Sequence, residues 1–237
     1  MNNTLLRSKL ELRVNKLASL DYGNIEPWQQ AEAVNKAQSE WVRRQLEGIN
    51  QEKAGNEAST RRIDDLQQLL VTWTGDFTPQ NNNQYWQSTT WPSNYMEWCR
   101  IDAQAQDDCK ICPPRPLTIF EGNEADVNVY LADTNRRPSY TWATTFSTVM
   151  NNTFKIWTDG EFNIVNPLVT FYRVPNTIVF LGTYDPYTNT TSTVDVPCEF
   201  PDNITEIIID EAAAILALDI DDNQKNAQLS QRAEHNT

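Results

Sequence analysis

The clearest helical stretch of the chain is DNITEIIIDEAAAILAL, residues 202–218. Asp202 or Asn203 can cap its start, and Glu206 falls in the first turn, where the helix dipole favours an acid. Its apolar residues recur at helical spacing and form one broad face, which consists of Ile204, Ile207, Ile208, Ala212, Ile215, Leu216 and Leu218. The stretch therefore predicts a C-terminal helix that packs through this face.

Helices are also predicted within residues 1–75. The first covers about 4–20, and its apolar stripe consists of Leu6, Leu10, Val14 and Leu17. A second begins at Pro27, which suits a first helical position, and Gly48 ends it. A third is expected over about 60–73. Three amphipathic helices of this size could form a small bundle.

The pattern changes between residues 76 and 200, where short runs of β-branched and aromatic residues alternate with Pro, Asn, Asp and Gly. Asp159-Gly160, between two such runs, predicts a hairpin turn. The expected strands are 96–103, 117–120, 127–131, 154–157, 168–174 and 177–181. The fold class is therefore α+β, with an N-terminal helical bundle (1–75), an inserted antiparallel β region (76–200), and a C-terminal helix with a polar tail (201–237).

Charge limits the range of partners. The 237 residues include 19 Lys and Arg against 32 Asp and Glu, which gives a net charge of −13. Such a chain has no surplus of cations to displace the counterions of a phosphate backbone, so we do not expect tight binding to nucleic acid or to an anionic membrane surface. No apolar run approaches the ~18–20 residues of a membrane-spanning helix.

The chemistry of the chain argues against an enzyme. The only histidine, His235, is the third residue from the end, where it is a poor candidate for a catalytic dyad or triad. Neither the dinucleotide-binding pattern of glycines nor a P-loop is present. No catalytic residue is therefore assigned.

The four cysteines offer a metal site. Cys109 and Cys112 form a C-x-x-C pair, which can place two thiolates on one tetrahedral metal. Cys99 and Cys198 would complete a four-thiolate set around a structural zinc. The alternative is that all four are small, partly buried free thiols, because zinc ribbons usually have two C-x-x-C pairs and this chain has one.

Two other groups of residues have alternative interpretations. Arginines on the expected helices could form bidentate pairs with acidic groups of a partner subunit, or could serve only solubility. With two apolar residues of the last helix they make up the expected partner interface, which comprises Arg43, Arg44, Arg61, Arg62, Ile207 and Ile208. The aromatic cluster of Trp86, Trp91, Tyr95 and Trp98 is either a corner of the core or a platform for stacking on sugars.

Several stretches together resemble one family. Residues 5–10 (LLRSKL) through 32–38 (EAVNKAQ) resemble the opening helices of head-to-tail connector proteins of tailed phages. The combination of later motifs is similar to virion ring proteins found beneath the portal in crAss-like podoviruses. These motifs are WPSNY at 91–95, DGEF at 159–162, FYRVP at 171–175 and EIIIDEAA at 206–213. The cysteines are not part of this pattern.

The resemblance implies a structural protein of the virion that is made in the host cytoplasm and resides at the head–tail junction. It implies a ring of twelve copies that contacts the portal and neighbouring tail or ring proteins and lines the channel through which DNA leaves. An acidic wall would let the duplex slide without sticking. Two alternatives stay open: a capsid-associated or decoration protein, and a carbohydrate-binding tail adaptor that uses the aromatics of residues 86–98.

Overall fold

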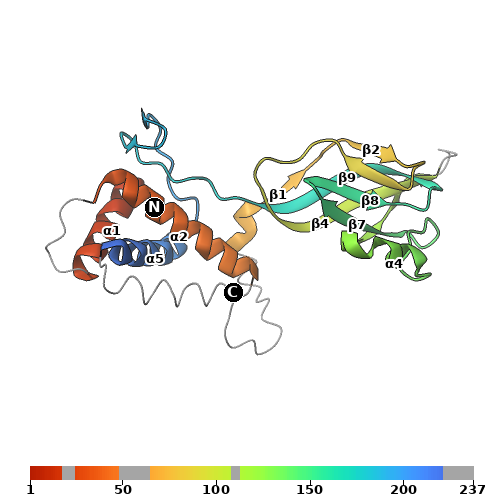
Figure 1. Ribbon diagram of the computed structural model, residues 1–237, viewed down its shortest axis with the longest axis horizontal. Coiled ribbons are helices and arrows are strands. Elements are labelled where there is room, and N and C mark those ends of the chain that lie inside the picture. Colours follow the sequence, from red (N-terminus) through yellow and green to blue (C-terminus); the bar gives the residue numbers. More distant parts are fainter. Residues whose placement is uncertain (18–24, 48–64, 108–112, 221–237) are drawn as a thin grey trace, which may run out of the picture. The chain divides into compact units, whose positions relative to one another are not determined.

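The computed structural model describes residues 1–17, 25–47, 65–107 and 113–220, and its chain combines helices with largely antiparallel sheets. The chain divides into two compact units (Figure 1): unit 1 contains residues 1–68 and 175–237, and unit 2 contains residues 69–174. The described helices longer than two turns belong to unit 1 and the two larger sheets to unit 2. These boundaries differ from the expected division at 75 and 200, because residues 175–200 group with the helices rather than with the sheets.

Unit 1 is organised around its last helix. Helix α5 (Asp202–Ile220) packs against both α1 (Asn3–Leu17) and α2 (Pro27–Glu47). The three helices lie where the sequence pattern predicts them. The buried residues of α5 are Ile204, Thr205, Ile208, Ile209, Ala212, Ala213, Ile215 and Leu216. Because α1 and α2 make their main contacts with α5, the helices at the start of the chain depend on the one near its end.

Residues 175–200 run along unit 1 without a long strand. The strand expected over 177–181 is reduced to one isolated bridge between Val179 and Val196, followed by the two-residue pair of β10 (Tyr184–Asp185) and β11 (Thr190–Thr191). Side-chain amides replace the missing sheet partners. Asn35 Oδ1 accepts a hydrogen bond from the Ile178 amide at 2.8 Å, and Asn35 Nδ2 donates to the Ile178 carbonyl at 2.9 Å.

Unit 2 consists of two sheets packed face to face, with the short helix α4 (Val127–Ala132) beside them. The first sheet is antiparallel throughout and has the order β1 (Leu70–Trp73), β9 (Phe162–Arg173), β4 (Tyr95–Asp107) and β5 (Arg115–Pro116). The second has the order β2 (Phe77–Gln80), β3 (Tyr85–Ser88), β8 (Thr153–Trp157), β7 (Thr144–Met150) and β6 (Thr118–Glu121). Its pair β6–β7 is parallel, which the expected antiparallel region did not include.

The core of unit 2 lies between the two sheets. Its fully buried centre includes Phe154 from β8 and Phe171 from β9. The ring of Trp91 stacks on Phe154, with 4.4 Å between centroids and an interplanar angle of 21°, and Trp73 lies 5.9 Å from the same ring. Phe154 is thus the residue on which aromatic side chains from several segments converge.

Two sequence predictions in this region need correction. The third helix was expected over 60–73, of which 60–64 lie outside the described residues, 65 and 66 are helical and 67–69 form a 3-10 turn. Its end is wrong, since 70–73 form β1 because Leu69, Val71 and Trp73 alternate toward the interior. Residues 127–131 were expected as a strand but belong to α4. The Asn123 side chain accepts a hydrogen bond from the Ala125 amide and starts the helical turns that lead into α4.

The Asp159-Gly160 turn is a corner between the sheets rather than a hairpin. The strands on either side of it, β8 and β9, belong to different sheets and do not pair. Phe154 and Ile156 of β8 and Phe162 and Ile164 of β9 are all buried in one core, so the strands must face each other across it. Gly160 has a φ of +84°, which suits glycine at this sharp change of direction.

Truncating the Phe154 side chain should destabilise unit 2. We expect Phe154→Ala to lower the free energy of unfolding by about 3–5 kcal/mol, since it removes buried area and leaves a cavity among Trp73, Trp91 and Tyr95. The matched control is Phe120→Ala, because the Phe120 side chain is 54% exposed; it should cost less than about 1 kcal/mol. Urea unfolding followed by tryptophan fluorescence measures both, and equal losses would contradict the assignment.

Candidate functional site

The structure describes two of the four cysteines. Cys99 lies in β4 of unit 2 and is half-buried, whereas Cys198 is buried in unit 1. Cys198 accepts a hydrogen bond from Thr205 and donates one to Gln38. Cys109 and Cys112 lie outside the described residues, so the four-thiolate zinc site stays a prediction. Within the described part of the chain, no three His, Cys, Asp or Glu side chains are grouped so that they could hold a metal ion.

The expected interface residues separate into different environments. Arg43 and Arg44 are both exposed, and Arg44 pairs with Glu211 of α5 within unit 1. Ile207 is 47% exposed, but Ile208 is fully buried and therefore belongs to the core of unit 1 rather than to a surface. Arg61 and Arg62 lie outside the described residues. Ile208 is thus removed from the expected interface, because its position on α5 turns it toward the neighbouring helices.

Ion pairs join α5 to both α1 and α2 of unit 1: Arg44 of α2 pairs with Glu211, and α1 pairs with the start of α5. Glu206 of α5 binds both Lys9 and Arg13 of α1, and Arg13 also reaches Asp210 at 3.1 Å. The hydrogen bond from Lys9, followed by that from Arg13 and by the charges of both, lowers the pKa of Glu206. These contacts fix α1 against α5 in one register and engage two of the four basic residues of α1, Lys9 and Arg13.

The aromatic cluster of residues 86–98 forms a core corner for the most part. Trp91 and Tyr95 pack on Phe154, and Trp86 lies against the same core, where its indole N–H donates to Asn83 at 2.6 Å. Trp98 also touches this core but lines an open pocket as well. The cluster is therefore not one continuous platform for a sugar, and only its last member borders a cavity.

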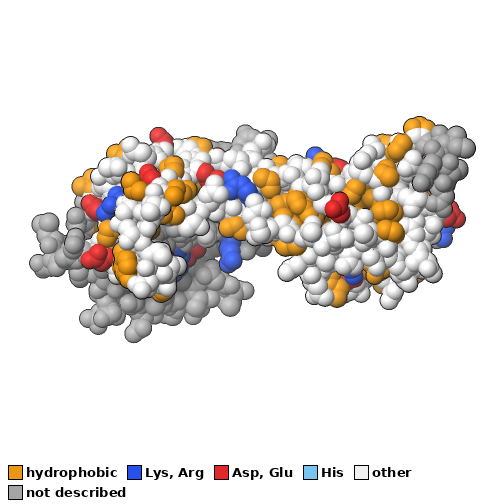
Figure 2. Space-filling model, turned by 90° about the horizontal axis from the view of Figure 1, so that it is seen from above, with side chains coloured by type: hydrophobic (Ala, Val, Ile, Leu, Met, Phe, Trp, Pro, Cys, Tyr) orange, Lys and Arg blue, Asp and Glu red, His pale blue; other side chains and the backbone are white. Residues whose placement is uncertain are grey.

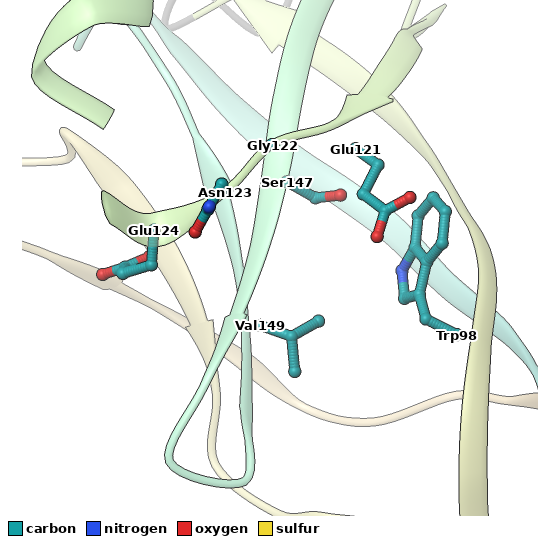
Figure 3. Close-up of a pocket in the computed structure, with 7 residues that line it drawn as sticks. All are labelled: Trp98, Glu121, Gly122, Asn123, Glu124, Ser147 and Val149. Carbon is teal, nitrogen blue, oxygen red and sulfur yellow. The ribbon is translucent and has the colours of Figure 1, made fainter. Parts of the chain in front are cut away.

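The pocket beside Trp98 is the candidate site of unit 2. It has a volume of about 450 Å³ and is lined by Trp98, Glu121, Gly122, Asn123, Glu124, Ser147 and Val149. Trp98 comes from β4 of one sheet, and the others come from β6, β7 and the turn after β6 in the other sheet. In Figure 3 the Glu121 carboxylate lies beside the indole of Trp98, while the Glu124 carboxylate points away from the other labelled side chains.

Irregular pairing of β4 sets the position of Trp98. The register of β4 against β9 shifts between Tyr95 and Glu97, between Trp98 and Arg100, and between Asp102 and Gln104. The first two shifts insert an extra residue on β4 and the third inserts one on β9, and each re-aims the side chains that follow, as β-bulges do. Simple alternation along the strand therefore does not predict which residues face the pocket.

Gly122 brings the turn after β6 close to β7. Its amide donates to the Ser147 carbonyl at 2.8 Å. A Cβ at this position would lie 3.0 Å from the Phe146 ring and 3.2 Å from the Tyr130 ring. A larger residue would have to displace these rings, so glycine favours the close approach of the segment from Glu121 to Glu124 to β7, which forms one wall of the pocket.

Glu124 is committed to a structural network. Its carboxylate binds Lys155 and accepts a hydrogen bond from Thr148, whose hydroxyl in turn accepts one from the Trp157 indole at 3.1 Å. The Glu121 carboxylate has no hydrogen-bond or ion-pair partner among the described residues. Of the two acids that line the pocket, Glu121 is thus the one available to a ligand.

The pocket region carries negative potential. Burial, and then the charges of Glu97 and Glu121, raise the pKa of Tyr95 to about 12. The Tyr95 hydroxyl therefore stays neutral at physiological pH, and the two carboxylates provide the charge there. An anion would be repelled from this site, whereas a cation or a neutral hydrogen-bonding group would not.

The chain matches no protein-family model and no curated protein. No described helix is both long enough and apolar enough to cross a membrane.

The ion pairs of Glu206 make unit 1 sensitive to acid. Because the folded state lowers the pKa of this carboxyl, its contribution is fully present above the ordinary glutamate pKa and is lost as the pH falls through the lowered value. We expect Glu206→Gln to cost about 0.5–1 kcal/mol at pH 7 and much less at pH 3. Thermal unfolding across this pH range measures the difference. Glu32→Gln, at an exposed position of α2, is the control, and a pH-independent loss in Glu206→Gln would contradict the mechanism.

Proposed function

We propose that the chain is a structural protein of a tailed-phage virion, a head-to-tail connector that forms a ring of about twelve copies beneath the portal. In this proposal the N-terminal helices form a bundle that builds the body of the ring, and the acidic protein lines the channel through which DNA leaves. The observation that carries the proposal is the exposed apolar surface on α1 and α5. It supports contact between copies, because the opposite faces of these helices already have their partners in unit 1.

That apolar surface consists of Leu5 and Leu12 on α1 and Ile207 on α5, each about half exposed. Leu5 and Leu12 are seven residues apart, which places them on one face of α1. α1 also packs against α5, the helix that carries Ile207. Side chains of this kind favour burial against a second copy, and a head-to-tail interface repeated around an axis closes a ring.

Charge supports the proposed role in DNA passage. The net charge of −13 gives no basis for sequence-independent DNA binding. On the face seen in Figure 2, acidic side chains are scattered over both units and do not gather in one patch. An acidic wall of this kind would repel the duplex and keep friction low during ejection.

Copy number in purified virions tests the proposed location. Quantitative mass spectrometry against the major capsid protein should give about twelve copies per particle, because a closed ring has a fixed small number of subunits. Hundreds of copies would instead place the chain on the capsid shell as a decoration protein. Absence from the particle would refute a virion role and favour a carbohydrate-binding module that acts outside the particle, although the aromatic cluster is not one continuous platform in this structure.

A single charge on α5 should prevent assembly while the fold survives. We expect Ile207→Asp to weaken self-association at least about tenfold, since it places a charge in an apolar contact. Native mass spectrometry measures the distribution of oligomers. Asn203→Asp, at another exposed position of α5, adds the same charge outside the apolar contact and is the control. Unchanged oligomers in Ile207→Asp would exclude this surface as the interface.

A further inference from the structure

The pocket beside Trp98 contains polar groups that the fold itself does not use. The Glu121 carboxylate and the Trp98 indole N–H have no hydrogen-bond partner among the described residues. The Asn123 carbonyl oxygen caps the turn before α4, which leaves its amide N–H₂ available. Ser147 makes only a long contact, 3.5 Å, to the Phe120 carbonyl. An aromatic ring, a free carboxylate and small polar groups therefore border one cavity of about 450 Å³.

Charge decides which ligand fits this cavity. Lys155, a cation close to the pocket wall, is already paired with Glu124 and so does not neutralise Glu121. The neighbouring Glu97 adds a second negative charge on β4. A cationic group that entered between the indole of Trp98 and the carboxylate of Glu121 would gain an ion pair and a cation–π contact together.

We propose that this pocket binds the guanidinium group of an arginine side chain presented by a partner protein. A guanidinium is flat, so it can stack on the Trp98 indole while its N–H groups form a forked pair with the two oxygens of Glu121. The volume accommodates a side chain of this size. Because the Trp98 wall belongs to one sheet and the Glu121 wall to the other, the bound arginine would bridge the two sheets where β4 contacts β6.

This site is independent of the proposed ring. The pocket lies within unit 2, whereas the apolar surface proposed for self-association lies on α1 and α5 of unit 1. Either proposal can fail without the other, because copy number reports on the ring and ligand binding reports on the pocket.

Saturation-transfer NMR on the full chain tests the site with a defined probe, N-acetyl-arginine methylamide. This compound carries the arginine side chain on a neutral backbone, and the method detects weak ligands of large assemblies. We expect saturable binding with a Kd on the order of 1–10 mM, as for a single anchored side chain. The uncharged counterpart, N-acetyl-citrulline methylamide, should bind at least about fivefold more weakly.

Variants separate the pocket from general attraction to an acidic protein. Glu121→Gln should weaken binding of the arginine probe at least about fivefold, while Glu161→Gln, at an exposed acid elsewhere in unit 2, should leave it unchanged. Circular dichroism would verify that both variants fold. Equal binding of the citrulline compound, an unaltered Kd in Glu121→Gln, or no saturable signal up to 50 mM probe would overturn the proposal. Binding of methyl glucoside that competes with the arginine probe would overturn it in favour of a sugar site.

Discussion

The structure of unit 1 depends on burial of the apolar face of α5. This helix meets α1 on one side and α2 on another, and its buried isoleucines and alanines are the surface that these two helices share. Burial of each large side chain contributes about 1.5–3 kcal/mol, so several such residues together outweigh any single ion pair of the helices. The salt bridges of Glu206 then select one register among the many that apolar contact alone would permit. Residues 175–200 add to this unit through amide contacts such as those of Asn35, although their sequence is like that of a sheet.

Where the hydrophobic pattern had one interpretation, it was sufficient to predict structure. The helices over 3–17, 27–47 and 202–220 have apolar residues at regular helical spacing and clear residues at their boundaries, and they lie at the expected places. The apolar residues around Leu69, Val71 and Trp73 fit both the alternation of a strand and the spacing of a helix. The segment forms a strand because Val71 and Trp73 pack against the core of unit 2. At Asp159-Gly160 the turn was identified correctly, but whether two strands pair or face each other depends on which sheet each joins. That choice is made by distant residues, so local sequence does not contain it.

The candidate site was less predictable than the fold. The aromatic residues from 86 to 98 were recognised as a group, yet nothing in their composition separates Trp91, which stacks in the core, from Trp98, which borders the pocket. The register shifts of β4 make that difference, and such irregularities leave no clear mark in a single sequence. Glu121 was one acid among 32 and had no signal of its own until the fold placed it beside an indole. Glu124, three residues later, has the same chemistry but is already paired with Lys155.

The pairing of β1 with β9 has a mechanical consequence. Leu70, near the start of unit 2, lies opposite Tyr172, near its end, so the chain enters and leaves this unit at adjacent points. A tension applied through residues 69 and 174 would break the hydrogen bonds between β1 and β9 one after another, starting at Leu70 and Tyr172, rather than all at once. Unit 2 would therefore open at low force from that end, while its central strands stayed closed. The same adjacency makes unit 2 an insertion that a short loop could replace, with the two halves of unit 1 still joined at their natural spacing.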